Sequence, residues 1–155
     1  MIPQRKFGLE IYGGRAQEIA ARTSPFDSYD ELLILESEEH LHSVLVLLDR
    51  LKEPYERCEL LWLGTDTWDR GELFADYAFV TDRGNVYVDL KTVAMFSLHA
   101  AKPDAEPAPA WLQLQEHLIG SVTSVGIPLL LIDRQLTELA DKIARVYGCS
   151  AEWHD

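Results

Sequence analysis

Residues Glu59 to Leu98 carry the strongest structural signals of the chain and read ELLWLGTDTWDRGELFADYAFVTDRGNVYVDLKTVAMFSL. An apolar strand is expected at Leu60 to Leu63, before a charged loop around Trp68. Two further arms, Tyr77 to Thr81 and Val86 to Lys91, are separated by Asp-Arg-Gly-Asn. Gly and Asn tolerate a positive φ, so this spacing predicts a β-hairpin.

The second hairpin arm alternates in polarity. Apolar residues occupy every second position, while Tyr87, Asp89 and Lys91 share the opposite face. The exposed face of this hairpin is therefore the first place to look for function.

The flanking sequence predicts alternating strands and helices. Towards the N-terminus we expect a strand at 6–12, a helix at 15–22, a buried strand at 32–35, and a helix that begins after the N-cap Ser37 and ends before Pro54. Towards the C-terminus we expect a mobile Pro/Ala-rich loop at 101–110, a helix at 111–125, a strand at 127–132, a helix capped by Asp133, and a frayed tail at 149–155.

This order, β-α-β-α-β-β-β-α-β-α, indicates an α/β class, with α+β as the alternative. We expect a mixed sheet of about six strands, parallel in part and antiparallel at the central hairpin, covered by helices. The 155 residues and 47% hydrophobic content are enough for a single domain, 1–155, with one core. The sequence shows no internal repeat.

Charge is the strongest global signal. The chain has 26 acidic and 14 basic residues, a formal net charge of −12. Nucleic-acid binders place Lys and Arg against phosphates, so nucleic acid is an unexpected ligand. A negative surface speeds encounter with a basic protein, although solubility alone also explains such a charge.

One charged loop combines acidic residues with an aromatic side chain. Asp66, Trp68, Asp69 and Glu72 are the candidate partner-binding residues, because Trp anchors interfaces and carboxylates pair with Arg or Lys. The alternative is that Trp68 folds back onto the core while the acids are merely hydrated.

A second pattern combines Asp76, before the first hairpin arm, with Asp89 and Lys91 in the second arm. Here the chain resembles the PD-(D/E)xK nuclease superfamily over roughly Ser37 to Asp133. The resemblance implies that Asp76 and Asp89 would bind a divalent metal, Mg²⁺ or Mn²⁺, with Lys91 near the attacking water. It also implies that Gln113 or Gln115 could take the place of a family glutamine.

Other residues suggest little chemistry. Cys58 and Cys149 match no metal-ligand spacing, and reduced thiols are expected, with a disulfide as the alternative. The first residues lack a secretory signal and no apolar run is long enough to span a bilayer, so a cytoplasmic location without membrane contact is expected.

Our leading hypothesis is an acidic, non-enzymatic binding protein that neutralises a basic partner. Its most concrete form is a bacterial immunity protein against a cationic toxin, with no cofactor and no metal. The alternative is a divalent-metal-dependent nuclease of the PD-(D/E)xK type, or an inactive relative.

Overall fold

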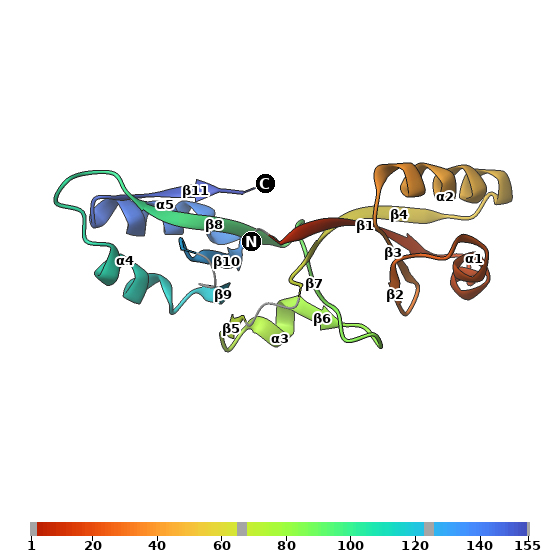
Figure 1. Ribbon diagram of the computed structural model, residues 1–155, viewed down its shortest axis with the longest axis horizontal. Helices are drawn as coiled ribbons and strands as arrows, with labels where there is room; N and C mark the ends of the chain where they lie inside the picture. Colours follow the sequence, from red (N-terminus) through yellow and green to blue (C-terminus); the bar gives the residue numbers. More distant parts are fainter. Residues whose placement is uncertain (1–2, 65–67, 123–125, 155) are drawn as a thin grey trace. The chain divides into compact units, whose positions relative to one another are not determined.

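The computed structural model describes residues 3–64, 68–122 and 126–154 and divides into two compact units (Figure 1). The N-terminal unit consists of Ile2–Gly64 and Phe79–Leu90. The C-terminal unit consists mainly of Thr65–Ala78 and Lys91–Asp155. The chain therefore passes from one unit to the other after residues 64, 78 and 90.

The N-terminal unit contains a six-stranded sheet in the order β2-β3-β1-β4-β7-β6. Its registered pairs, β2 with β3, β3 with β1, β1 with β4 and β4 with β7, are all antiparallel. The elements are β1 (Gln4–Ile11), α1 (Ala16–Thr23), β2 (Asp27–Tyr29), β3 (Leu32–Leu35), α2 (Glu38–Leu51), β4 (Tyr55–Trp62), β6 (Ala78–Val80) and β7 (Val86–Asp89).

Helix α2 begins and ends as the sequence predicts. The Ser37 side chain accepts a hydrogen bond from the His40 backbone N–H, and Lys52 ends the helix in the left-handed conformation, with φ 54°. The helix has 14 residues. Within the described ranges, no helix is long and apolar enough to cross a membrane.

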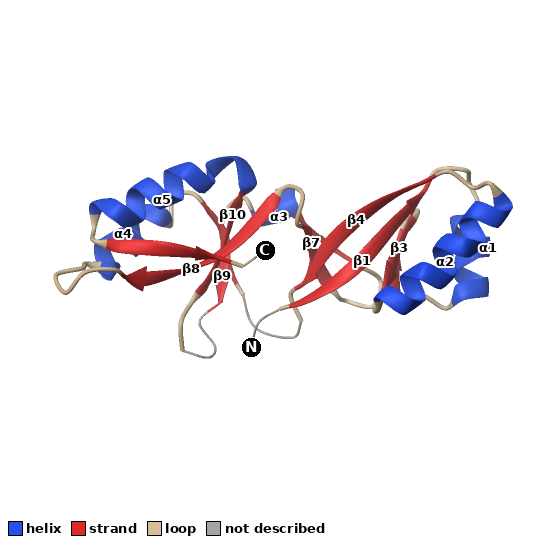
Figure 2. Cartoon of the chain, turned by 90° about the horizontal axis from the view of Figure 1, so that it is seen from above, coloured by secondary structure: helices blue, strands red, loops and turns tan. Residues whose placement is uncertain are grey.

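Both helices of the N-terminal unit cover the same face of its sheet (Figure 2). The alternate strand residues on this face pack against one apolar stripe of each helix. The buried core consists of Leu9, Ile11, Ala16, Ile19, Leu33, Leu35, Leu41, Val44 and Leu48.

The C-terminal unit contains a five-stranded sheet in the order β11-β8-β10-β9-β5, again with antiparallel pairs throughout. Helices α4 and α5 contribute to the same core as one face of this sheet. The elements are β5 (Asp69–Arg70), α3 (Phe74–Tyr77), β8 (Val93–Ala100), α4 (Pro107–Leu114), β9 (Leu118–Val122), β10 (Leu129–Asp133), the 3₁₀ turn η1 (Arg134–Leu136), α5 (Thr137–Val146) and β11 (Cys149–Trp153).

The two units share one topology. In each, four strands and two helices follow the order β-α-β-β-α-β, and the fourth, first, third and second strands are neighbours in the sheet. This is the split βαβ, or ferredoxin-like, arrangement. The fold thus repeats, although the sequence showed no repeat, because the shared feature is the connectivity and not the residues.

The α+β class is confirmed, but several expectations about the elements were wrong. The structure has two sheets where one was expected. No registered pair is parallel, because the two strands that each helix connects are separated in the sheet by an antiparallel strand. The helix expected at 111–125 ends at Leu114, and the frayed tail contains β11, which pairs with β8. The loop at 101–110 is shorter, because α4 begins at Pro107.

Candidate partner-binding cleft

The sheet of the N-terminal unit has a second face, whose apolar cluster contains no helix residue. Strand register places Lys6, Gly8 and Glu10 of β1 on this face, since their neighbours Phe7, Leu9 and Ile11 point into the helix-covered core. The cluster on it comprises Ile34, Leu60 and Tyr87, with Phe26, Leu32, Cys58, Trp62 and Phe79 packed around them.

A cleft of about 890 Å³ opens on this face and lies entirely within the N-terminal unit. Four carboxylates line it: Glu10 from β1, Asp30 and Glu31 from the β2–β3 turn, and Asp89 from the end of β7. Among the described residues, no Lys, Arg or His lines the cleft. Its aromatic lining comes from Tyr29 and Phe79, and its aliphatic lining from Leu32, Leu60 and Ala16, the first residue of α1.

The thiol of Cys58 lies in the lining of the cleft. Gly8 is directly opposite Cys58 on β1, and a Cβ added at Gly8 would lie only 2.4 Å from Cys58 Sγ. The glycine is therefore required for the thiol to lie over the strand. Burial, and then the charges of Asp89, Glu10 and Glu56, raise the pKa of Cys58 to about 11. Negative charge is thus concentrated around this thiol.

Like charges face each other at the edge of the cleft. Glu10 and Glu56 are directly opposite on β1 and β4, an arrangement that weakens strand pairing. The hydroxyl of Tyr12 donates a hydrogen bond to Glu56, and this bond is the main reason that the pKa of Tyr12 is raised to about 12. A cation bound beside Glu10 would relieve the repulsion.

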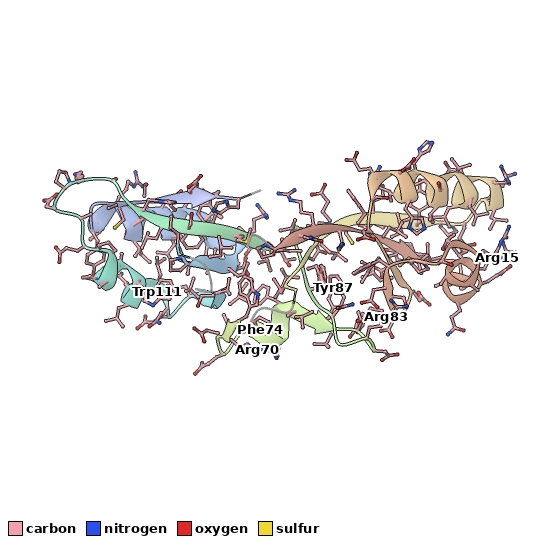
Figure 3. The ribbon with its side chains drawn as sticks, viewed as in Figure 1. Arg15, Arg70, Phe74, Arg83, Tyr87 and Trp111 are labelled. Atoms are coloured by element: carbon pink, nitrogen blue, oxygen red, sulfur yellow. The ribbon has the colours of Figure 1, made fainter. Side chains whose placement is uncertain are left out.

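A buried carboxylate holds the hairpin against the rest of this face. Asp27 Oδ2 accepts hydrogen bonds from Thr81, Asn85 and Tyr87, at 2.7, 2.8 and 3.0 Å. Burial raises the pKa of Asp27, but the hydrogen bonds together outweigh it and lower the pKa below its ordinary value. Tyr87, labelled in Figure 3, has a raised pKa because of burial and this bond.

The same face already holds one cation of the chain itself. Lys6 is 2% exposed, and its Nζ lies 4.3 Å from the ring centroid of Phe26 and 4.9 Å from that of Trp62. The ammonium also lies 3.3 Å from Gln4 Oε1 and 3.6 Å from Glu36 Oε1. Aromatic faces together with a carboxylate are thus sufficient to hold a cation here.

The acidic loop proposed from the sequence lies in the C-terminal unit. Asp66 is outside the described residues, and Trp68 is 8% exposed, so the buried placement of Trp68 is the one that the structure shows. Asp69 belongs to β5, which pairs with β9 and holds this segment against the sheet. Asp69 and Glu72 are exposed, and their role in partner binding remains a prediction.

A smaller groove, of about 690 Å³, lies beside this loop. Glu72 and Glu116 line it, but Arg70 lines it too, so its charge is mixed. Arg70 also lies over the Phe74 ring, with Cζ 4.8 Å from the centroid; Figure 3 labels both residues. The cleft of the N-terminal unit, whose described lining contains four carboxylates and no Lys, Arg or His, is the stronger candidate for a basic ligand.

The nuclease-like residues do not lie on two neighbouring strands. Asp76 is exposed on the one-turn helix α3, Asp89 ends β7, and Lys91 lies in the turn after it. Asp89 belongs to the N-terminal unit, whereas Asp76 and Lys91 belong to the other. Within residues 3–64, 68–122 and 126–154, no group of three His, Cys, Asp or Glu side chains is placed to hold a metal ion. The nuclease alternative stays a prediction from the sequence.

A polar cluster in the C-terminal unit was not foreseen. Ser97 Oγ lies 2.9 Å from His99 Nε2 and 3.0 Å from His154 Nε2, and Glu152 Oε2 lies 2.8 Å from the same His99 nitrogen. A catalytic triad needs the carboxylate on the opposite ring nitrogen from the serine. Because Ser97 is also only 2% exposed, this cluster joins β8 to the C-terminal strand and its tail and is not a nucleophile site.

The sequence contains a signal for the Ser97 cluster but none for the cleft. Ser97 and His99 are two apart, as are Glu152 and His154, which is the spacing of one strand face. The signal becomes readable only when both segments are known to be paired strands. The cleft carboxylates have no common motif, because separate strands and turns bring them together.

The comparisons with known proteins add no relative: no protein-family model, curated protein or solved structure matches the chain. Its class is defined by its own fold, an α+β protein in which two units share the β-α-β-β-α-β order. Its function must be argued from the residues of the cleft.

Proposed function

We propose that this protein binds a basic protein and neutralises it, as an immunity protein does with a cationic toxin. The observation that carries the proposal is the cleft on the open face of the N-terminal sheet, lined by Glu10, Asp30, Glu31 and Asp89 and by no basic residue that the structure describes. The net charge of −12 would draw a basic partner towards this cleft.

Two properties of the cleft support binding of a protein surface. Its lining combines charge with exposed aromatic area, since Tyr29 is 40% exposed and lies against Phe79, with ring centroids 4.7 Å apart. Aromatic side chains beside charged groups are typical of the residues that dominate protein interfaces. A basic partner would also relieve the repulsion between Glu10 and Glu56, and this relief would add to the free energy of binding.

The test is capture of partners from the source cells with the tagged 155-residue chain, followed by calorimetry with the purified partner. Glu10→Gln/Glu31→Gln removes two carboxylates from the cleft. We expect this variant to bind a basic partner about tenfold more weakly, because Glu10 and Glu31 are exposed and the two lost charge pairs are each worth roughly 0.5–1 kcal/mol. At equimolar amounts, the wild type should inhibit the partner's activity.

The matched control is Glu39→Gln/Asp49→Asn, which makes the same change in charge on α2, the helix that covers the opposite face of the sheet. It should bind as the wild type does. The proposal fails if the captured partner is not basic, or if the two variants lose affinity equally.

A further inference from the structure

Resting on the proposed function, we infer that the cleft receives an arginine side chain of the basic partner. The guanidinium would lie among the carboxylates of Glu10, Asp30, Glu31 and Asp89 and against the Tyr29–Phe79 aromatic pair. The alkyl part of the side chain would lie over Leu32 and Leu60. The partner's anchor is thus a single chemical group and not diffuse positive charge.

The first argument is the cation that the same sheet face already contains. Lys6 Nζ lies over the rings of Phe26 and Trp62 and within 3.6 Å of Glu36. Lys6 and Leu60 are directly opposite on β1 and β4, and Leu60 lines the cleft, so the two places are close on one face. The cleft has the same ingredients, aromatic rings and carboxylates, but among the described residues no cation of the chain lines it.

The second argument is the distribution of the carboxylates. They come from β1, from the β2–β3 turn and from β7, so they reach the cleft from different sides. A guanidinium presents five N–H donors in a plane and can bond to carboxylates while one face stacks on an aromatic ring. A lysine ammonium is a compact, strongly hydrated charge and can use fewer of these groups at once.

The third argument is the electrostatic field at the apolar part of the lining. The pKa of Cys58 is raised by burial and also by the charges of Asp89, Glu10 and Glu56. Those charges therefore act on the interior of the cleft as well as on its rim. At this half-buried position, negative charge favours a cation that sheds its water readily, as guanidinium does more easily than ammonium.

The experiment titrates the full chain with three capped pentapeptides, Gly-Ala-X-Ala-Gly, in which X is arginine, lysine or citrulline. Citrulline has nearly the shape of arginine but no charge. Amide NMR shifts report where each peptide binds. We expect the arginine peptide to shift the amides of Gly8, Cys58, Leu32 and Phe79, with about tenfold weaker binding in Glu10→Gln/Glu31→Gln. The variant Glu39→Gln/Asp49→Asn should bind as the wild type does.

Each other outcome overturns the inference. Equal affinity for the lysine peptide removes the preference for guanidinium. Equal affinity for the citrulline peptide removes the role of charge. Shifts scattered over acidic positions, equal in both variants, would mean only diffuse attraction. Capture of a basic partner through the cleft could still succeed in each case, so failure of this inference and failure of the proposed function are separate results.

Discussion

At the scale of single residues, Asp27 connects the cleft-bearing sheet face to the hairpin that supplies Phe79 and Asp89. The carboxylate is 5% exposed, and besides its three side-chain donors it accepts a hydrogen bond from the Ser28 backbone N–H at 2.8 Å. A buried carboxylate is tolerable only when such donors satisfy it.

Replacing Asp27 by Ala should lower the free energy of unfolding by about 3 kcal/mol at pH 7, because it leaves the buried donors of Thr81 and Tyr87 without an acceptor. Urea unfolding measures the difference. Asp49→Asn, an exposed carboxylate on α2, is the control and should change stability by less than about 0.5 kcal/mol.

The same residue fixes the sign of a pH effect. The pKa of Asp27 is lower in the folded chain than its ordinary value of about 3.9, so its stabilisation is present above that value and is lost as the pH falls through the folded pKa. The wild type should therefore lose more stability than Asp27→Ala between pH 7 and pH 3. A parallel decline of the two proteins would contradict the assignment.

At the scale of elements, the cluster around Ser97 explains why the C-terminal residues are ordered. The hydroxyl lies between His99 of β8 and His154, which follows β11, and Glu152 of β11 pairs with His99 when the imidazole is protonated. The five residues of β11 pair on one side only, with β8. This edge strand therefore depends on side-chain contacts to β8 as well as on its ladder.

Ser97→Ala should destabilise the protein by about 1–2 kcal/mol, the cost of leaving two part-buried imidazoles without their hydroxyl partner. Amide exchange in β11 should accelerate more than exchange in β9. Ser150→Ala, an exposed position on β11, is the control and should leave both unchanged. If the two variants behave alike, the hydroxyl has no role in holding β11.

The elements also show what a sequence can reveal. The hairpin turn and α2 were predicted because their signals are local: Gly84 in the turn has φ 84°, and Ser37 caps the helix with its own side chain. Strand β8 was missed because its first four residues, Val93 to Phe96, are all apolar and give no alternation. Strand β11 was missed because five residues acquire strand structure only through pairing with β8.

The candidate site was harder to predict for a related reason. Sequence reasoning favoured the loop at 66–72, where acids and an aromatic are adjacent in the chain. The cleft instead combines Glu10, the turn at 30–31 and Asp89, which are brought together by strand order. Only Asp89 was singled out beforehand, and for a different chemistry. Sites assembled across a sheet leave no local motif.

At the scale of the whole molecule, the two units are not independent stretches of chain. The segment 79–90 belongs to the N-terminal unit, yet it lies between two segments of the C-terminal unit in the sequence. Unfolding of one unit therefore removes the constraint on the ends of a chain segment that belongs to the other unit. Each unit has its own hydrophobic core, so the cores alone do not determine whether the two units unfold together or separately.

We expect the chain to unfold as a single domain, in one cooperative transition, because of this interleaving. Scanning calorimetry should give a calorimetric enthalpy equal to the van't Hoff enthalpy. Asp27→Ala, which disturbs only the N-terminal unit, should lower the midpoint of the entire transition. Two resolved transitions, only one of them shifted by the substitution, would show instead that the units unfold separately.

The interleaving also sets an order of events while the chain is being made. The first 64 residues contain all six elements of the N-terminal unit's β-α-β-β-α-β order. The hydrogen bond from Tyr87 to Asp27, however, can form only after Tyr87 has been translated, 60 positions later. At about 5–20 residues per second, that delay is roughly 3–12 s. Throughout this delay, the sheet of the nascent chain lacks the hairpin that supplies Phe79 and Asp89 to the cleft. A newly made molecule thus completes its acidic cleft late, after most of its first sheet has left the ribosome.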